Sequence, residues 1–175
     1  LLLIILMAAV VCLPLVLDAE NNYFIYYLFM SFTYTAMGQG FNIIAGYTGQ
    51  VSLGQHAFFG LGAYITVFAW EFAGLEYFNP FAMILSGLFP SILAILVGLP
   101  LLSKLRGDYF SLGTLGLGEI LRVIFIQGRA VTGGSMGKYL PSGAYTSMLP
   151  YYFTALFLAV LATAVIYLLV RSRIG

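Results

Sequence analysis

The chain has 175 residues, of which 7% are charged and 62% are hydrophobic, and its mean hydropathy is strongly positive. A water-exposed surface needs roughly a quarter of its residues charged, so this composition excludes an ordinary soluble globular protein. The net charge of +1 gives no electrostatic basis for binding nucleic acid. We therefore expect most of the surface to face the lipid bilayer, in an all-α, polytopic bundle of transmembrane helices.

At about 20 residues for each crossing, the chain has room for about six apolar segments, one or two of them broken or re-entrant. The first segment, residues 1–17, starts inside an apolar run without a charged start or a cleavage site, which indicates a clipped transmembrane helix rather than a signal peptide. We expect a single transmembrane domain over residues 1–175, truncated at both ends. The other apolar segments are predicted at residues 23–44, 55–72, 81–102, 109–126 and 151–170, with one long connection at 127–150.

The charges beside these segments predict the orientation, because basic residues near span ends favour the cytoplasm. Four basic residues are placed inside: Lys104, Arg106, Arg171 and Arg173. The acidic residues of two turns then lie outside: Asp18, Glu20, Glu71 and Glu76. Every segment alternates correctly in this arrangement, and its exceptions are Arg129 and Lys138, which would lie in the outside connection.

Residues 46–54 read GYTGQVSLG and separate two apolar segments without a single charge. Non-helical backbone at membrane depth persists only where protein buries it or where it lines a water-filled cavity. The glycines therefore predict a broken helix beside a solute path, and an ordinary turn at the membrane surface is the alternative. The candidate residues for this path or helix break are Gly46, Gly49, Gln50, Ser52, Gln55 and His56.

His56 follows Ser52 by one helical turn, a spacing that would suit a Ser–His nucleophile. The serine does not lie in a GxSxG turn and no nearby acid could orient the imidazole, so we reject this enzymatic interpretation. We expect instead that His56 makes an interhelical hydrogen bond.

Three ionisable residues mark the apolar segment at 109–126 and its start: Asp108, Glu119 and Arg122. Glu119 and Arg122 are three residues apart, so they can pair on one helical face. Charged groups at membrane depth are rare and indicate function, but such a pair can also simply lock two helices together. The sequence leaves both interpretations open.

Nucleotide and metal motifs are incomplete. The glycine-rich run that ends at Lys138 is one residue short of a Walker loop, and Tyr139 replaces its Ser or Thr. Cys12 is the single cysteine and there is no Cys/His cluster for a metal. We expect no cofactor in this chain, and any ATP hydrolysis would belong to a separate subunit.

Three ordered motifs carry a family resemblance: GYTGQVSLGQHAFFGLGAY at residues 46–64, RGDYFSLGTLGLGEILR at residues 106–122, and Thr132-Gly133-Gly134 in the following connection. Together with the order of the spans, they resemble the membrane permease subunits of bacterial ABC importers for branched-chain amino acids, in particular the LivM-like half. The resemblance covers nearly the whole chain. Members of the family continue beyond the Arg-Ser-Arg-Ile-Gly region into a loop that docks on the ATPase, and that part is absent here.

The resemblance implies a multi-pass protein of the bacterial inner membrane that carries branched-chain or related small amino acids. It implies three kinds of partner, namely a second permease subunit, cytoplasmic ATP-binding subunits and a periplasmic substrate-binding protein. Urea or short-amide permeases share a similar scaffold and are an alternative. A secondary transporter that uses Glu119, Asp108 or His56 as an ion site is another, and a membrane-embedded enzyme has no supporting constellation.

Overall fold

A computed structural model of the chain describes residues 10–14, 16–17, 23–73, 78–139 and 147–171. Its regular elements are all helical, which confirms the all-α architecture for these residues. Part of the first predicted segment and several charges used for the orientation lie outside them: residues 1–9, Asp18, Glu20, Glu76 and Arg173. The elements are α2 (Tyr23–Asn42), η1 (Ile43–Tyr47), α3 (Gln55–Ala73), α4 (Pro80–Lys104), α5 (Asp108–Gln127), α6 (Arg129–Thr132), η2 (Gly134–Met136) and α7 (Leu149–Arg171).

Helices α4, α5 and α7 are each long and apolar enough to cross a membrane, judged by length and composition among the described residues. They correspond to the predicted segments at 81–102, 109–126 and 151–170. The long connection at 127–150 is not wholly irregular, because it contains α6 and the 3-10 turn η2. The start of α4 follows from its sequence: Asn79 accepts a hydrogen bond from the Phe81 N–H at 2.9 Å, and Pro80 occupies the first helical turn.

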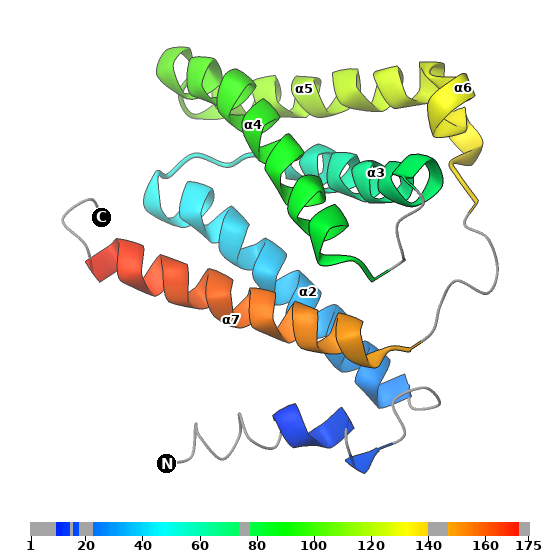
Figure 1. The fold of residues 1–175 in the computed structure, drawn as a ribbon. Coiled ribbons are helices and arrows are strands. Elements are labelled where there is room, and N and C mark those ends of the chain that lie inside the picture. The colour runs from blue at the N-terminus through cyan, green and yellow to red at the C-terminus, as the bar shows by residue number, and fades with distance from the viewer. Residues whose placement is uncertain (1–9, 15, 18–22, 74–77, 140–146, 172–175) are drawn as a thin grey trace. The chain divides into compact units, whose positions relative to one another are not determined.

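The chain forms two compact units, one of residues 1–43 and 145–175 and the other of residues 44–144. In the first unit α2 packs along α7 (Figure 1). Its core consists of Ile25, Tyr152 and Leu156, and the Tyr152 hydroxyl donates to the Val10 carbonyl at 2.8 Å. Gln39 near the end of α2 lies 3.4 Å from the Thr163 hydroxyl. Because Ile25 meets Tyr152 and Gln39 meets Thr163, α2 and α7 run in the same direction.

Helix α2 is less apolar than α4 or α7, since it carries several hydroxyl residues. Those of Ser31, Thr33 and Thr35 donate to the carbonyl oxygen four residues earlier, at 2.7–2.9 Å. A hydroxyl that is satisfied by its own helix needs no water. The polar sequence of α2 is therefore compatible with a lipid environment.

In the second unit α3 packs against α4 and α5, and glycines make these approaches close. A Cβ atom at Gly62 would lie 2.9 Å from the Ser86 carbonyl oxygen of α4. One at Gly113 would lie 2.8 Å from a methyl group of Leu105. Gly62 thus lets the backbones of α3 and α4 meet, as small residues do in membrane proteins generally, and Gly113 makes room for the Leu105 side chain. Helices α3 and α5 run side by side in the same direction (Figure 1).

Candidate functional site

The segment between α2 and α3 is irregular, as the sequence predicts. Helix α2 ends at Asn42, the π-helical turn η1 follows, and residues 48–54 belong to no helix until α3 begins at Gln55. Gly46 lies in the π-helical turn, and Gly49 has a φ of 67°, in the left-handed region that glycine adopts at little cost. The change from helix to irregular chain therefore occurs where the glycines are.

This segment is docked on the first turns of α5 by two hydroxyl groups. The Leu53 N–H donates to the Thr114 hydroxyl at 3.0 Å, and the Ser111 hydroxyl donates to the Val51 carbonyl at 2.7 Å. A Cβ atom at Gly54 would overlap the Thr114 carbonyl oxygen, so only glycine fits there. Because hydroxyls on α5 replace the missing helical hydrogen bonds, the irregular backbone can be held within the protein.

The polar residues of the segment have different surroundings. Ser52 is buried, with 8% of its surface exposed, and does not line the neighbouring cavity. The side-chain oxygen of Gln50 is buried and has no hydrogen-bond partner among the described residues. An unsatisfied buried acceptor costs about 1–3 kcal/mol. Gln50 is therefore the residue of this segment whose side chain most needs a further partner.

His56, in the first turn of α3, packs on α5 at Gly118. A Cβ atom at Gly118 would lie 3.2 Å from the imidazole ring, so a larger residue there would displace it. The interhelical hydrogen bond expected of His56 is not found in the part of the chain that the structure describes. The contact between the two helices at this point is one of close packing.

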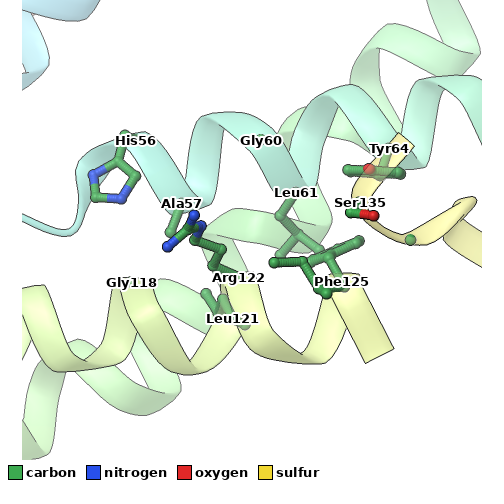
Figure 2. Close-up of a pocket in the computed structure, with 12 residues that line it drawn as sticks. His56, Ala57, Gly60, Leu61, Tyr64, Gly118, Leu121, Arg122, Phe125 and Ser135 are labelled. Atoms are coloured by element: carbon green, nitrogen blue, oxygen red, sulfur yellow. The ribbon is translucent and has the colours of Figure 1, made fainter. Parts of the chain in front are cut away.

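A cavity of about 400 Å³ lies between α3 and α5 and is bordered by η2 (Figure 2). Its wall is mostly apolar, with Tyr64 of α3 stacked on Phe125 of α5 at a ring-centroid distance of 4.5 Å. His56 and Arg122 lie toward one end and Tyr64 and Ser135 toward the other (Figure 2). The lining residues are His56, Ala57, Gly60, Leu61, Tyr64, Gly118, Leu121, Arg122, Phe125, Ile126, Gly134 and Ser135.

The predicted Glu119–Arg122 ion pair is present. An Arg122 Nη1 donates to the Glu119 carboxylate at 3.1 Å, and the side chains are 68% and 55% exposed for Arg122 and Glu119. The described residues of this chain therefore do not bury the pair. Only Arg122 of the two lines the cavity. Burial against another protein segment stays a prediction.

Asp108 lies apart from the cavity. It occupies the first turn of α5 and is exposed. Its negative charge stabilises the positive N-terminal end of the helix dipole. Ten residues of helix, about 15 Å, separate it from Gly118. The structure therefore gives Asp108 a place at the helix start and does not bring it to His56 or Arg122.

The Thr132-Gly133-Gly134 motif turns the chain back at the end of α5. The buried Thr132 hydroxyl lies within hydrogen-bonding distance of the Phe125 and Gly128 carbonyls and accepts the Gly134 N–H at 3.2 Å. Gly133 and Gly134 have positive φ values of 77° and 65°. This turn positions η2, and with it Ser135, against the cavity.

Lys138, which follows this turn, contacts α3 through its side chain. Its ammonium group pairs with Glu71 and lies 5.8 Å and 5.5 Å from the ring centroids of Phe68 and Phe72. Lys138, one of the two cations that violate the positive-inside pattern, is thus neutralised by an acidic residue. The ion pair also joins the end of α3 to the connection after α5, and the predicted orientation places both on the same side of the membrane.

Sequence reasoning did not single out Leu61, Tyr64, Leu121, Phe125 and Ser135 as site residues. A signal for the helical ones was present, since the lining positions on each helix recur at the three- and four-residue spacing of one face. Ser135 had no such signal, because it reaches the cavity through the Thr132 turn. Among the described residues no group of His, Cys, Asp and Glu could hold a metal ion.

Residues 23–175 match the protein family described as branched-chain amino acid transport system / permease component. The chain belongs to this family. This membership confirms the resemblance read from the motifs at 46–64 and 106–122, and it identifies the chain as a membrane protein of a transport system.

Two curated relatives of this permease chain are similar over 108 residues. One is the high-affinity branched-chain amino acid transport system permease protein LivM of Salmonella typhimurium strain LT2, which is 35% identical, and the other is LivM of Escherichia coli K12, which is 33% identical. Each alignment covers 62% of this chain and 25% of the relative, so the aligned part is about a quarter of the relatives' length. No solved structure matches the chain significantly.

Proposed function

We propose that this chain forms part of the solute pathway of an ATP-driven importer that moves branched-chain or related small amino acids across the bacterial inner membrane. The family match over residues 23–175 carries the proposal. The names of the two LivM relatives support the choice of substrate. The importer would also contain a second permease subunit, ATP-binding subunits that hydrolyse ATP, and a periplasmic substrate-binding protein.

In this proposal the chain crosses the membrane several times. Helices α4, α5 and α7 have the required length and hydropathy, and α2, α3 and the first apolar segment would complete six crossings. The parallel pairs α2–α7 and α3–α5 support this topology, because alternate crossings from the predicted sides require both pairs to be parallel. The Lys138–Glu71 ion pair supports this topology further, because it joins the end of α3 to the connection after α5, and both are assigned to the outside.

Accessibility labelling tests this orientation. In a Cys12→Ala background of the full-length protein without other cysteines, Met136→Cys is the best probe, because Met136 is 81% exposed. We expect an impermeant maleimide to label it from the periplasmic side, and Ser103→Cys, beside Lys104, to react only from the cytoplasmic side. The reverse pattern would overturn the arrangement.

Within this topology, the irregular segment at residues 46–54 would lie beside the solute path. Its docking on α5 through Ser111 and Thr114 supports a buried position. The unsatisfied Gln50 oxygen supports a role in contacting polar solute or water. Glycine at 46 and 49 would let the backbone approach the path closely.

Transport by the full-length protein with its partner subunits tests the function. We expect uptake of radiolabelled leucine into proteoliposomes to require internal ATP, to stop when the ATPase subunit is inactivated, and to be insensitive to a protonophore. The protonophore matters because a secondary transporter is the main alternative. Uptake that continues without ATP and collapses with the proton gradient would contradict the importer.

A further inference from the structure

We infer that the cavity between α3 and α5 binds the transported solute itself, as a carboxylate with a compact aliphatic side chain, and that Arg122 binds the carboxylate. This inference rests on the proposed transport function and adds where the solute binds and which groups select it. The volume of about 400 Å³ is near the lower end of the range of 300–1,000 Å³ found for ligand pockets. It therefore suits a molecule of amino-acid size.

Arg122 provides the charge recognition. It is the permanently charged residue among those that line the cavity, and its side chain rises from α5 toward α3 (Figure 2). One of its nitrogens donates a hydrogen bond to the Glu119 carboxylate at 3.1 Å. A guanidinium has five N–H donors in a planar fork, so others remain for a carboxylate. Glu119 holds the guanidinium in place without entering the cavity.

The rest of the wall favours an aliphatic side chain. Leu61, Leu121, Phe125 and Ile126 contribute apolar surface from both helices. A pocket of this kind distinguishes substrates that differ by one methylene roughly 10- to 200-fold. Tyr64 and Ser135 lie toward the other end of the cavity, so the aliphatic side chain of a solute whose carboxylate is bound to Arg122 extends toward them.

Glycines keep the cavity open. Gly60 lines it, and a Cβ atom at Gly60 would meet no atom within 4 Å. A larger side chain at this position therefore has room in the cavity without displacing the described protein. On α5, Gly118 leaves space for the His56 ring, because it has no side chain.

The position of the cavity along the membrane agrees with import. Its α5 residues, Gly118 to Ile126, lie about 15 to 27 Å from the start of that helix. In the proposed topology α5 starts at the cytoplasmic side. The cavity then occupies the outer half of the membrane, where a solute delivered from outside arrives first.

Two adjacent residues of η2 offer a matched test of binding. Ser135 lines the cavity, and Met136 does not. Ser135→Cys and Met136→Cys are each placed in the complete transporter without other cysteines, and maleimide labelling rates are compared with and without L-leucine. We expect leucine to slow labelling at position 135 at least fivefold and to leave position 136 unchanged. Leucinol, which lacks the carboxylate, should protect neither.

The labelling result separates this inference from the proposed function. If the wild-type transporter takes up leucine in an ATP-dependent manner but leucine protects neither position, or protects both equally, the cavity is not the binding site and the function stands. Protection at position 135 by leucinol as strong as by leucine would contradict the role of Arg122. Absence of leucine uptake by the wild-type transporter would instead contradict the proposed function.

Two variants test the site by kinetics. Arg122→Gln should raise the KM for leucine roughly ten- to hundredfold, the effect of losing a charge-assisted hydrogen bond, and Arg122→Lys should restore part of it. Gly60→Leu should fill the cavity and raise the KM at least tenfold. The control is Gly98→Leu on α4, where a Cβ atom also meets nothing within 4 Å. Normal KM values for assembled Gly60→Leu transporter would overturn the inference.

Discussion

In the first unit α2 and α7 are joined by large side chains, whereas in the second unit α3 reaches α4 and α5 through glycines. Ile25, Tyr152 and Leu156 fill the space between α2 and α7. At Gly54 and Gly62, by contrast, one backbone lies directly against another. The second unit also contains the irregular segment and the cavity. The missing side chain at Gly60 leaves space between α3 and α5, while large side chains fill the space between α2 and α7.

The largest expected effect concerns the ion pair of the second unit. We predict that another protein segment covers Glu119 and Arg122 in the assembled permease. Glu119→Ala would then leave the Arg122 charge buried without its partner and lower the free energy of unfolding by about 3–5 kcal/mol. The Glu119→Ala, Arg122→Ala double variant would lose less stability. The assembled fraction of each variant, measured by size-exclusion chromatography from one membrane preparation, tests this.

Three results would contradict a covered structural pair. Equal damage by the double variant and by the sum of the single variants would show that the residues are uncoupled. A loss near 0–1 kcal/mol for Glu119→Ala would show that the pair stays exposed to water. Normal assembly with abolished uptake would assign Glu119 to the transport mechanism.

Gly54→Ala should cost roughly 3 kcal/mol, at the upper end of overpacking effects, because the overlapping atom is a backbone oxygen of Thr114 that cannot rotate away. The matched control is Gly98→Ala, which meets open space within a helix and should stabilise by about 0.5–1 kcal/mol. Thermal unfolding of the purified complex measures both. Equal stability of the two variants would show that the irregular segment is not docked on α5.

Gly49→Leu should cost less stability, about 1–2 kcal/mol, because φ is positive but no described atom lies within 4 Å. We expect the assembled variant nevertheless to transport leucine poorly, since a bulky side chain would project beside the solute path. Gly40→Leu in α2 is the control, with equal space in a regular helix. Normal uptake by Gly49→Leu would remove residues 46–54 from the pathway.

The smallest effect is expected in the first unit. Tyr152→Phe removes the hydrogen bond to the Val10 carbonyl and keeps the ring packing, so it should cost about 1 kcal/mol. The exposed Tyr34→Phe should change stability by less than about 0.5 kcal/mol. Neither variant should alter the KM for leucine. An altered KM for Tyr152→Phe would break the division between a supporting unit and a solute-binding unit.

Much of the candidate site could be predicted from local sequence. The glycines of residues 46–54 between apolar runs indicated the irregular backbone, and the three-residue spacing of Glu119 and Arg122 indicated their ion pair. The expected hydrogen bond of His56 was not found among the described residues, because its neighbour on α5 is Gly118, which has no side chain to accept or donate. Which residue faces another helix depends on the rotation of both helices, and sequence spacing constrains only one at a time.

By itself, the sequence determined the all-helical architecture, the approximate helix boundaries and the position of the break, because hydropathy, glycine and proline act within a few residues of the chain. The tertiary structure decided that Ser111 and Thr114 hold the irregular segment, that Lys138 pairs with Glu71, and that a cavity opens between α3 and α5. These features join residues about 60 positions apart, and their register is set by how glycine-lined helix faces pack. That register is a property of two surfaces together, which no single segment of sequence contains.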